Sequence, residues 1–275
     1  MKPPQKKVKI GILGCGAIGS RIAIACFDEI QDFCRLSRIY DIADEKMNDL
    51  LNKVSQPLLK RKSLQDLIKN CDLMVEAVNS TKTRALIKEA LLAKKDVLAM
   101  SAGKLISAQS LFKIAQKNHC TIIVPSGAIA GIDAIQAASL TRVFSATLTT
   151  RKPLSGFSNN DYLRKKRINL SRIKKEQTIF EGSVKDAVKH FPRNINVAAT
   201  LALSLHNKAP LKVRILTSPH FKNNSHEIEI LGDFGKLKCR TYNDVCPDNP
   251  KTSFLAILSG IQALKNHCQY LRIGT

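Results

Sequence analysis

The feature that most constrains this chain is a glycine-rich turn near its start. Residues 14–19 read GCGAIG, which is a GxGxxG pattern. The apolar run at 8–13 predicts a buried strand before the turn, and apolar residues at every fourth position predict a helix over 18–27. A strand, a glycine turn and a helix in this order begin the βαβ unit that binds dinucleotides. The pattern is weak by itself, and this context makes it specific.

Each glycine of the turn has its own physical task. Gly14 permits the tight turn, Gly16 lets the backbone approach a pyrophosphate, and Gly19 lets the helix pack closely against the strand. The free amides at the start of the helix then face the phosphates. Asp41 lies 22 residues after Gly19 (41 − 19), where a carboxylate accepts hydrogen bonds from the adenosine ribose. We therefore predict NAD as cofactor, with NADP as the alternative, held by Gly14, Gly16, Ala17, Ile18, Gly19 and Asp41.

The order of apolar runs and helical patterns predicts two domains in an α/β protein. Through residue 124 the apolar runs and the helical patterns alternate, which is typical of an N-terminal Rossmann domain with a doubly wound parallel sheet. Later strand-like runs follow one another, two of them around a turn at 232–235, and favour a C-terminal α+β catalytic domain with a mixed or antiparallel sheet. We expect domains at 1–134 and 135–250, with a helix over 251–270 completing the first. The polar stretch 154–169 is interpreted as a long loop.

The charge of the chain is strongly positive. There are 44 Lys and Arg residues against 22 Asp and Glu, which gives a formal charge of +22. Such an excess can attract polyanions. However, the basic residues are spread along the whole chain, and the densest run, at 164–175, accompanies no known nucleic-acid-binding motif. We expect no nucleic-acid partner, and the charge can instead attract anionic substrates and cofactors.

The cysteines and the N-terminus bear on where the protein works. No two of the eight cysteines are spaced as CxxC, so we expect no metal site, and several lie in apolar runs, as reduced core cysteines do. The first apolar run, at 8–13, is too short for a membrane span, and no signal segment precedes it. We expect a cytoplasmic protein with no membrane association.

Four segments of the second half carry a more specific signal. They are PSGAIAGIDA at 125–134, FEGS at 180–183 with HFPRNINVAAT at 190–200, HEI at 226–228 and NPKTS at 249–253. The stretch TRKP at 150–153 fits the same pattern. In this order they resemble the L-aspartate dehydrogenase family, and the resemblance spans nearly the whole chain. The basic stretch around 155–175 departs from the family pattern and its role stays open.

The resemblance implies NAD(P)-dependent oxidative deamination of L-aspartate, through iminoaspartate, to oxaloacetate and ammonium. His226 matches the family's catalytic histidine, and an imidazole suits a base that activates water at the imine. Ala130 matches a position whose backbone contacts the cofactor. Asn196 matches a position near the nicotinamide, where an amide can hold the cofactor or the substrate, while Asn194 better suits a helix cap. His190, beside this motif, is the second candidate for the base.

The substrate carries two carboxylates at neutral pH, so cationic or hydrogen-bond-donating groups should bind it. Lys152 lies on one family-like segment. Lys251, Thr252 and Ser253 lie on another, at the start of the predicted C-terminal helix, where a helix N-terminus favours a carboxylate. With Asn196 and His226, these are the predicted substrate residues. Further candidates lie where strands of the first domain end: Glu76, Asn79, Ser80, Ser101, Ala102 and Gly103.

Two other interpretations stay open at the level of the sequence. A homoserine-dehydrogenase-like or dihydrodipicolinate-reductase-like enzyme has the same two-domain plan and would differ in its substrate. A non-catalytic NAD-binding basic protein is supported only by the charge. The resemblance also implies a homodimer and a use of iminoaspartate in pyridine nucleotide biosynthesis.

Overall fold

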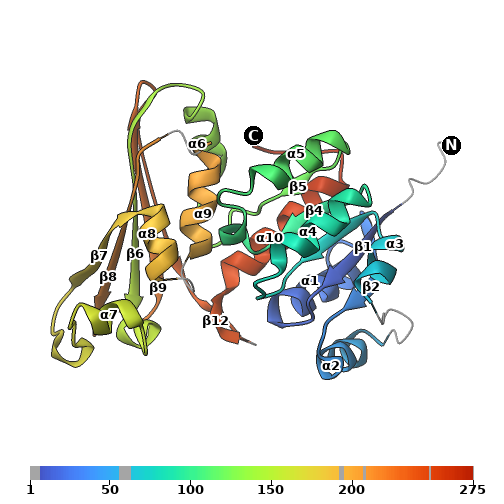
Figure 1. Cartoon of the computed structure of the whole chain (residues 1–275), viewed down its shortest axis with the longest axis horizontal. Helices are drawn as coiled ribbons and strands as arrows, with labels where there is room; N and C mark the ends of the chain where they lie inside the picture. Colours follow the sequence, from blue (N-terminus) through green and yellow to red (C-terminus); the bar gives the residue numbers. More distant parts are fainter. Residues whose placement is uncertain (1–6, 56–62, 192–194, 207–208, 248, 275) are drawn as a thin grey trace. The chain divides into compact units, whose positions relative to one another are not determined.

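The computed structural model describes residues 7–55, 63–191, 195–206, 209–247 and 249–274, without the side chains of 195 and 249–251. The chain divides into two compact units. The first comprises Met1–Pro125 with Ile257–Arg272, and the second Ser126–Ala256 with Ile273–Thr275 (Figure 1). The contacts divide the chain after Pro125, whereas the sequence predicts a domain boundary after residue 134.

The first unit is built on a parallel sheet. Its five strands are ordered β2-β1-β3-β4-β5 and all paired neighbours run parallel. The predicted Rossmann-like parallel sheet is confirmed. In this sheet β1 lies between β2 and β3, and its Ile10 and Ile12 are fully buried, as its mostly apolar sequence predicts. The strands are β1 (Val8–Leu13), β2 (Cys34–Tyr40), β3 (Leu73–Glu76), β4 (Asp96–Ala99) and β5 (Ile122–Ile123).

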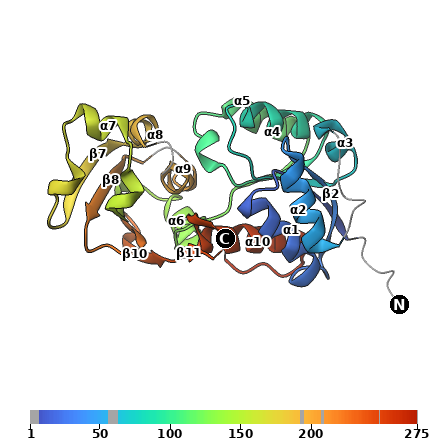
Figure 2. The same cartoon turned by 90° about the horizontal axis from the view of Figure 1, so that it is seen from below.

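Helices cover both faces of this sheet. In Figure 2, α3, α4 and α5 lie along one side of it, and α1 and α10 along the other. The Ser63 hydroxyl accepts a hydrogen bond from the Asp66 amide at 3.2 Å, so Ser63, the first residue of the capping pattern SLQD at 63–66, caps α3. The helices are α1 (Ala17–Asp28), α2 (Asp44–Val54), α3 (Leu64–Lys69), α4 (Thr83–Leu92), α5 (Gln109–Lys117) and α10 (Phe254–Cys268), with a 3₁₀ turn η2 (Ala102–Lys104).

The last helix begins later than the sequence predicts. Residues 251–253, expected to open it, belong instead to the strand β12 (Asn249–Ser253), which pairs antiparallel with β11 (Val245–Cys246). The Phe254 amide donates to the Asp244 carbonyl at 3.0 Å, and α10 starts there. The prediction of a helix from residue 251 is wrong because this pairing holds the segment extended. Lys251 and Thr252 therefore lie on this strand, and Ser253 ends it immediately before α10.

The second unit contains a mixed sheet, as predicted. Its order is β10-β9-β6-β8-β7, in which β6 and β8 run parallel and the other neighbours antiparallel. The turn at 232–235 joins β9 to β10 as an antiparallel hairpin. No strand was predicted where β7 lies. The strands are β6 (Val143–Pro153), β7 (Gln177–Ser183), β8 (Leu211–Ser218), β9 (Asn224–Gly232) and β10 (Gly235–Asn243).

One face of this sheet packs against helices. The core joins Leu148, Ile215 and Ile228 from the strands to Phe191 and Leu201 from the helical side. We call this the core face and the opposite side the outer face. The helices of this unit include α6 (Ile132–Ala138), α8 (Val184–His190) and α9 (Ile195–Ser204). Asn194, the predicted cap of α9, lies outside the described residues.

The stretch interpreted as a long loop has structure of its own. It contains η3 (Leu154–Phe157) and α7 (Asp161–Lys165), and η4 (Leu170–Arg172) follows it. Phe157 and Leu163 are buried in the core, and the Asn160 side chain caps α7 by accepting from the Leu163 amide at 3.1 Å. The prediction is wrong because two apolar side chains and a local cap are sufficient to order a mostly polar segment.

Candidate functional site

At two positions of the glycine turn in the first unit, the structure leaves no room for a side chain. Gly14 has a φ of +99°, and a Cβ there would lie 2.6 Å from the Ala77 carbonyl oxygen. A Cβ on Gly19 would lie 1.8 Å from the Gly14 carbonyl oxygen. Both contacts are with backbone, which cannot swing aside as a side chain does. These two glycines are therefore required by the fold of the turn itself.

Gly16 differs from its two neighbours in the motif. A Cβ there would meet no atom within 4 Å, and its φ is −74°, so the protein fold does not require glycine at this position. Gly16 is the N-cap of α1 and supplies no side-chain hydrogen bond to the first turn, which includes Ala17 and Ile18. Open space in front of helix amides suits a close-lying anion. The turn fits the pyrophosphate of a dinucleotide.

Asp41 stabilises this turn through hydrogen bonds from backbone amides. One carboxylate oxygen, Oδ2, accepts from the Cys15 amide at 2.8 Å, and the other, Oδ1, accepts from the Ala43 amide at 2.9 Å. Sequence reasoning assigned Asp41 to the ribose and missed this structural role. A carboxylate has about four acceptor positions, so the two amides leave capacity for ribose hydroxyls.

Cys15, inside the turn, is not a reactive thiol. Burial, assisted by the nearby Asp41 carboxylate, raises the pKa of Cys15 to about 12, so the thiol stays protonated at neutral pH. All eight cysteines are free thiols, and six of them are buried. They behave as core side chains in both units.

Glu76 ends β3 as a fully buried carboxyl group. It accepts hydrogen bonds from the Val78 amide (3.0 Å), the Ser101 amide (3.2 Å) and the Ser101 hydroxyl (2.9 Å). Burial is the largest influence on it and raises its pKa. These bonds tie the carboxyl ends of β3 and β4 together. Glu76 and Ser101, both named from the sequence as strand-end candidates, thus meet at this edge, while Asn79 is exposed.

In the second unit, His226 lies at one end of the core face. It is 5% exposed, sits on β9 opposite Thr150 of β6, and its Nδ1 lies 3.0 Å from the Thr150 hydroxyl oxygen. Burial, and then the nearby Lys152 charge, lower the pKa of His226 to about 3. The imidazole is therefore neutral at physiological pH.

Lys152 follows Thr150 by two residues on β6. Side chains alternate along a strand, so Lys152 faces the same side of the sheet as Thr150 and His226. Its carbonyl accepts from the Thr217 hydroxyl at 2.8 Å, which fixes this end of β6 against β8. The side chain is partly buried, and burial lowers the pKa of the Lys152 ammonium to about 8.

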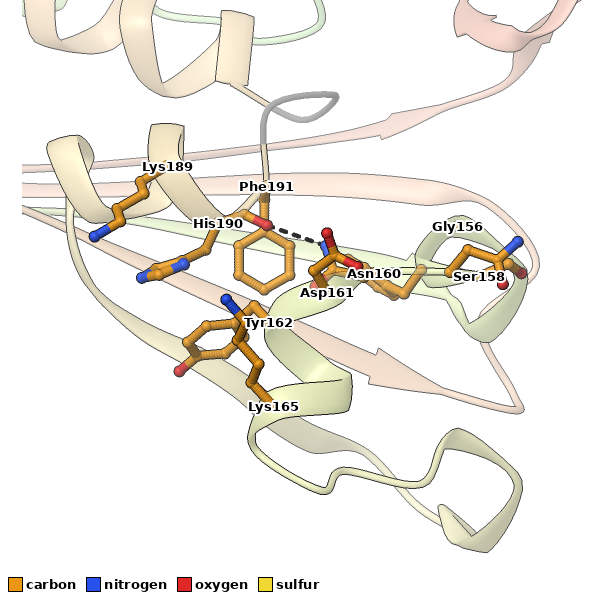
Figure 3. Close-up of a pocket in the computed structure, with 11 residues that line it drawn as sticks. Gly156, Ser158, Asn160, Asp161, Tyr162, Lys165, Lys189, His190 and Phe191 are labelled. Atoms are coloured by element: carbon orange, nitrogen blue, oxygen red, sulfur yellow. Dashed lines mark hydrogen bonds between the residues drawn. The ribbon is translucent and has the colours of Figure 1, made fainter.

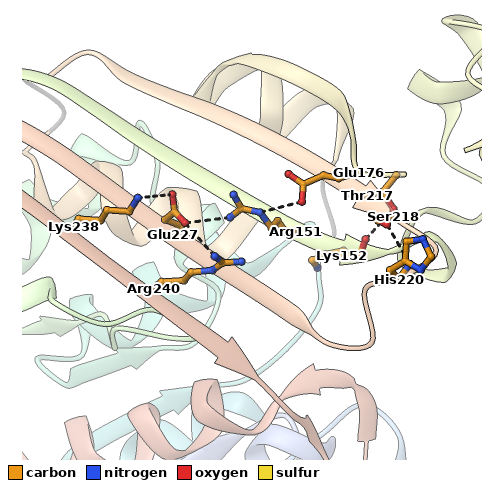
Figure 4. A network of polar contacts seen from close by, with 9 residues as sticks. All are labelled: Arg151, Lys152, Glu176, Thr217, Ser218, His220, Glu227, Lys238 and Arg240. Atoms are coloured by element: carbon orange, nitrogen blue, oxygen red, sulfur yellow. Dashed lines mark hydrogen bonds and ion pairs between the residues drawn. The ribbon is translucent and has the colours of Figure 1, made fainter. Parts of the chain in front are cut away.

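A charged network on the outer face holds β6 and β9 in register beside this pair (Figure 4). Glu227, the neighbour of His226, lies 3.4 Å from Arg151, the neighbour of Thr150. Arg240 and Lys238 lie 3.6 and 3.5 Å from the same carboxylate. Two consecutive cross-strand pairs thus face opposite sides, Thr150–His226 toward the core and Arg151–Glu227 away from it.

The loop that carries Ala130 is fixed by β10. Ala130 is exposed, and its carbonyl accepts from the Cys239 thiol at 3.2 Å. The buried Asn243 side chain donates to the Ala128 carbonyl at 3.1 Å and accepts from the Ser253 hydroxyl at 3.1 Å. Ser253, a predicted substrate residue, is therefore linked to the Ala130 loop through Asn243.

The other predicted residues are placed as follows. Asn196 is the second residue of α9 and is exposed. Thr252 is partly buried on β12, and the side chain of Lys251 lies outside the described residues. The glycine turn belongs to the first unit and His226 to the second.

His190, the second candidate for the base, lines a cavity of the second unit. This cavity of about 400 Å³ is lined by η3, α7 and the end of α8, and His226 does not line it (Figure 3). The His190 ring lies 4.6 Å from the Tyr162 ring, and its carbonyl accepts from the Asn160 side chain at 3.0 Å. His190 therefore packs in the second unit's aromatic cluster.

Sequence reasoning missed Thr150 and Asn243 as parts of the site. Thr150 belongs to the TRKP segment at 150–153, where the alternation of side chains along a strand places it on one face with Lys152. Asn243 had no local signal, because its partners, Ala128 and Ser253, are 115 and 10 residues away. Within the described ranges, no group of three or more His, Cys, Asp or Glu is arranged to hold a metal ion, and no helix is long and apolar enough to cross a membrane.

Comparison with protein families gives two matches along the chain. Residues 133–267 match the C-terminal domain of aspartate dehydrogenase. Residues 14–125 match the NAD-binding domain of homoserine dehydrogenase. The second match bears on the dinucleotide-binding half, and the first on the half that contains His226.

Individual relatives match along almost their whole length. L-aspartate dehydrogenase from Methanosarcina barkeri is 39% identical over 98% of this chain and 100% of its own length. That from Methanococcus maripaludis is 38% identical with the same coverage. Among solved structures, aspartate dehydrogenase from Thermotoga maritima has a TM-score of 0.72 at 21% identity, covering 98% of this chain and 100% of that one. The similarity of this structure confirms the fold.

Proposed function

Because this chain belongs to the L-aspartate dehydrogenase family, we propose that it oxidises L-aspartate to iminoaspartate with NAD as cofactor, with hydrolysis of the imine to oxaloacetate and ammonium. The observation that carries the proposal is the environment of His226. A neutral, buried imidazole with a fixed hydrogen-bond partner lies within a domain that matches this family. The family match to homoserine dehydrogenase covers residues 14–125, in the other half.

The glycine turn is where the cofactor would bind. Gly16 leaves open space before the amides of α1, which suits the pyrophosphate, and Asp41 retains acceptor capacity for the ribose. A bound nicotinamide supplies the acceptor for the hydride that leaves Cα of the substrate. We propose NAD rather than NADP because of the carboxylate of Asp41, and propose Ala130 and Asn196 as further cofactor contacts from the family resemblance.

We propose His226 as the base that activates water at the imine. Among the described residues its hydrogen-bonding partner is Thr150, through Nδ1, which leaves Nε2 for the substrate. Water then attacks the carbon of the protonated imine while one of its protons passes to Nε2, which gives a carbinolamine. The imidazolium returns this proton to the amino nitrogen. The C–N bond then breaks as the hydroxyl becomes a carbonyl, and the hydroxyl proton leaves with the departing ammonia as ammonium. This role requires Nδ1–H to donate to the Thr150 oxygen, so that Nε2 carries the lone pair.

The function is tested by offering L-aspartate, D-aspartate, L-glutamate and L-homoserine in turn and recording NADH absorbance. We expect NADH formation with L-aspartate, and NADH consumption with oxaloacetate plus ammonium. Turnover of L-homoserine without turnover of L-aspartate would favour the homoserine-dehydrogenase-like alternative. Binding of NAD without turnover of any of the four would favour a non-catalytic NAD-binding protein.

The role of His226 is tested by His226→Ala and His226→Asn. General-base catalysis contributes about 10²–10⁴-fold in rate, so each variant should lose about that factor in turnover. The loss applies to His226→Asn as well, because an amide cannot accept the proton. NAD affinity should change little in either variant, because the cofactor turn lies in the other unit. Turnover within a few-fold of the unmodified protein would exclude His226 as the base.

We further propose a cytoplasmic homodimer that supplies iminoaspartate to pyridine nucleotide biosynthesis. The dimer and the pathway rest on the family resemblance, and the location on eight free thiols. The outer face of the second unit alternates Lys and Arg with Glu, a pattern that can pair with a symmetry-related copy. Light scattering on the purified protein measures the oligomeric state, and a monomeric mass would contradict the dimer.

A further inference from the structure

The end of β6 places a cation beside the proposed base. Lys152 lies two residues beyond Thr150 on the same face, about 7 Å along the strand at about 3.3 Å per residue. The backbone there is fixed by pairing with β8, where the Thr217 hydroxyl donates to the Lys152 carbonyl at 2.8 Å. The pairing of β6 with β9 ends at Arg151–Ser225, so Lys152 lies past the paired part of β9.

This position is electrostatically unusual. The Lys152 ammonium is partly buried, and the loss of solvent lowers its pKa to about 8. Its charge also lowers the pKa of His226. A desolvated ammonium is stabilised by an anion at hydrogen-bond distance, and a substrate carboxylate can supply that anion.

We propose that Lys152 binds a carboxylate of the L-aspartate substrate, and that this pairing makes His226 a better proton acceptor. The inference rests on the proposed function and adds to it a residue that couples substrate binding to the base. When a carboxylate offsets the Lys152 charge, the repulsion between that charge and a proton on His226 decreases. The base then gains basicity only when substrate is present.

The surroundings of Lys152 determine how its binding depends on pH. His226 is the titratable group that faces it from β9, and β8 contributes the uncharged Thr217. Arg151, which pairs with Glu176 and Glu227, faces away from this side, and His220 follows the end of β8 (Figure 4). Because only the ammonium form binds a carboxylate, substrate capture by the free enzyme should weaken as the pH rises through about 8.

Two substitutions separate binding of a carboxylate from a proton-accepting role. In Lys152→Arg the cation is kept and stays protonated at all working pH values, but it cannot accept a proton. In Lys152→Met the chain is of similar length and the charge is removed. Lys212→Met is the matched control, because it removes an exposed lysine of the same sheet, on β8, that pairs with Glu181.

The experiment records kcat/KM for L-aspartate from about pH 6 to about pH 10, with circular dichroism and NAD titration as checks on folding and cofactor binding. In the unmodified protein we expect kcat/KM to fall tenfold per pH unit above about 8. Lys152→Arg should remain active and lose this fall. Lys152→Met should lose about 10- to 100-fold, mostly in KM, since a charge-assisted hydrogen bond contributes about 1.5–3 kcal/mol. Lys212→Met should resemble the unmodified protein.

Competitive inhibitors identify which carboxylate is bound. L-asparagine keeps the α-carboxylate alone and 3-aminopropionate keeps the side-chain carboxylate alone, so Lys152→Met should raise the inhibition constant of the one that Lys152 contacts. A folded but inactive Lys152→Arg protein would instead assign Lys152 as a proton acceptor and overturn the inference, as would an unchanged KM in Lys152→Met. Failure of the unmodified protein to oxidise L-aspartate would contradict the proposed function separately.

Discussion

Substitution of two glycines in one turn should separate folding from cofactor binding. A Cβ on Gly19 would lie 1.8 Å from the Gly14 carbonyl oxygen, whereas a Cβ on Gly16 would meet nothing within 4 Å. Overpacking of this kind costs about 1–3 kcal/mol. Gly19→Ala should therefore lower the stability of the first unit by about that amount, and Gly16→Ala should leave it within about 0.5 kcal/mol of the unmodified protein.

For cofactor affinity the order of the two substitutions should be reversed, with the larger effect from Gly16→Ala. A methyl group on Gly16 occupies the space in which the pyrophosphate would meet the amides of α1. Loss of one hydrogen bond to a charged group costs about 1.5–3 kcal/mol, so the Kd of NADH should rise about 10- to 100-fold. Gly16→Val, which fills more of this space, should weaken binding further.

Urea unfolding followed by circular dichroism measures the first quantity, and NADH fluorescence titration of the folded protein measures the second. Gly235→Ala is a useful comparison, because it changes a glycine with open space around it in the turn between β9 and β10 of the other unit, although its φ of +109° adds backbone strain. Unchanged NADH affinity in a folded Gly16→Val protein would refute the assignment of the turn. A Gly19→Ala protein as stable as the unmodified chain would refute the steric argument.

Two further substitutions test contacts that the structure adds to the sequence. Asp41→Ala should narrow the preference for NAD over NADP, and it should also lower the free energy of unfolding by about 1–3 kcal/mol because the Cys15 and Ala43 amides lose their acceptor. Asp41→Asn should retain more stability, since its side-chain oxygen can still accept a hydrogen bond. Kd values for both cofactors and thermal unfolding measure these effects, and an unchanged cofactor preference would exclude Asp41 from ribose binding. Thr150→Val should lower kcat about 2- to 10-fold at unchanged NADH affinity, since it removes one hydrogen bond of about 0.5–1.5 kcal/mol from His226, and an unchanged kcat would show that the imidazole is oriented by other contacts.

Much of the first unit could be predicted from the sequence because its signals are local. The apolar run of β1 matches the observed strand at both ends, and Ser63 caps α3 as the SLQD pattern indicates. Parallel strands buried on both faces give continuous apolar runs, and helices between them show a period near 3.6. Such signals require no knowledge of distant contacts.

The errors occur where strand pairing and burial, and not the apolar pattern of the segment itself, decide the structure. Residues 251–253 form a strand because they pair with β11, and the helical pattern that follows them gives no warning of this. The segment with α7 is ordered by burial of Phe157 and Leu163 in a core supplied by other strands. The bracing role of Asp41 and the position of Asn243 likewise depend on backbone groups far along the chain.

The burial of His226 has a consequence for stability at acid pH. Its pKa is about 3 in the folded protein, below its ordinary value of 6.5, so the unfolded chain takes up a proton first as the pH falls. Above about pH 6.5 the imidazole is neutral in both states and contributes no pH dependence. Between about 6.5 and about 3 the free energy of unfolding should decrease, by about 1.4 kcal/mol for each pH unit. At about pH 4.5 the loss from this one group should be about 2–3 kcal/mol.

Urea unfolding at about pH 7 and about pH 4.5 measures the loss in the unmodified protein and in His226→Gln, whose amide does not titrate. The variant should lose about 2–3 kcal/mol less between the two pH values. Equal losses in the two proteins would show that His226 takes up its proton as readily in the folded chain as in the unfolded one, and would remove the basis for treating it as a buried neutral imidazole.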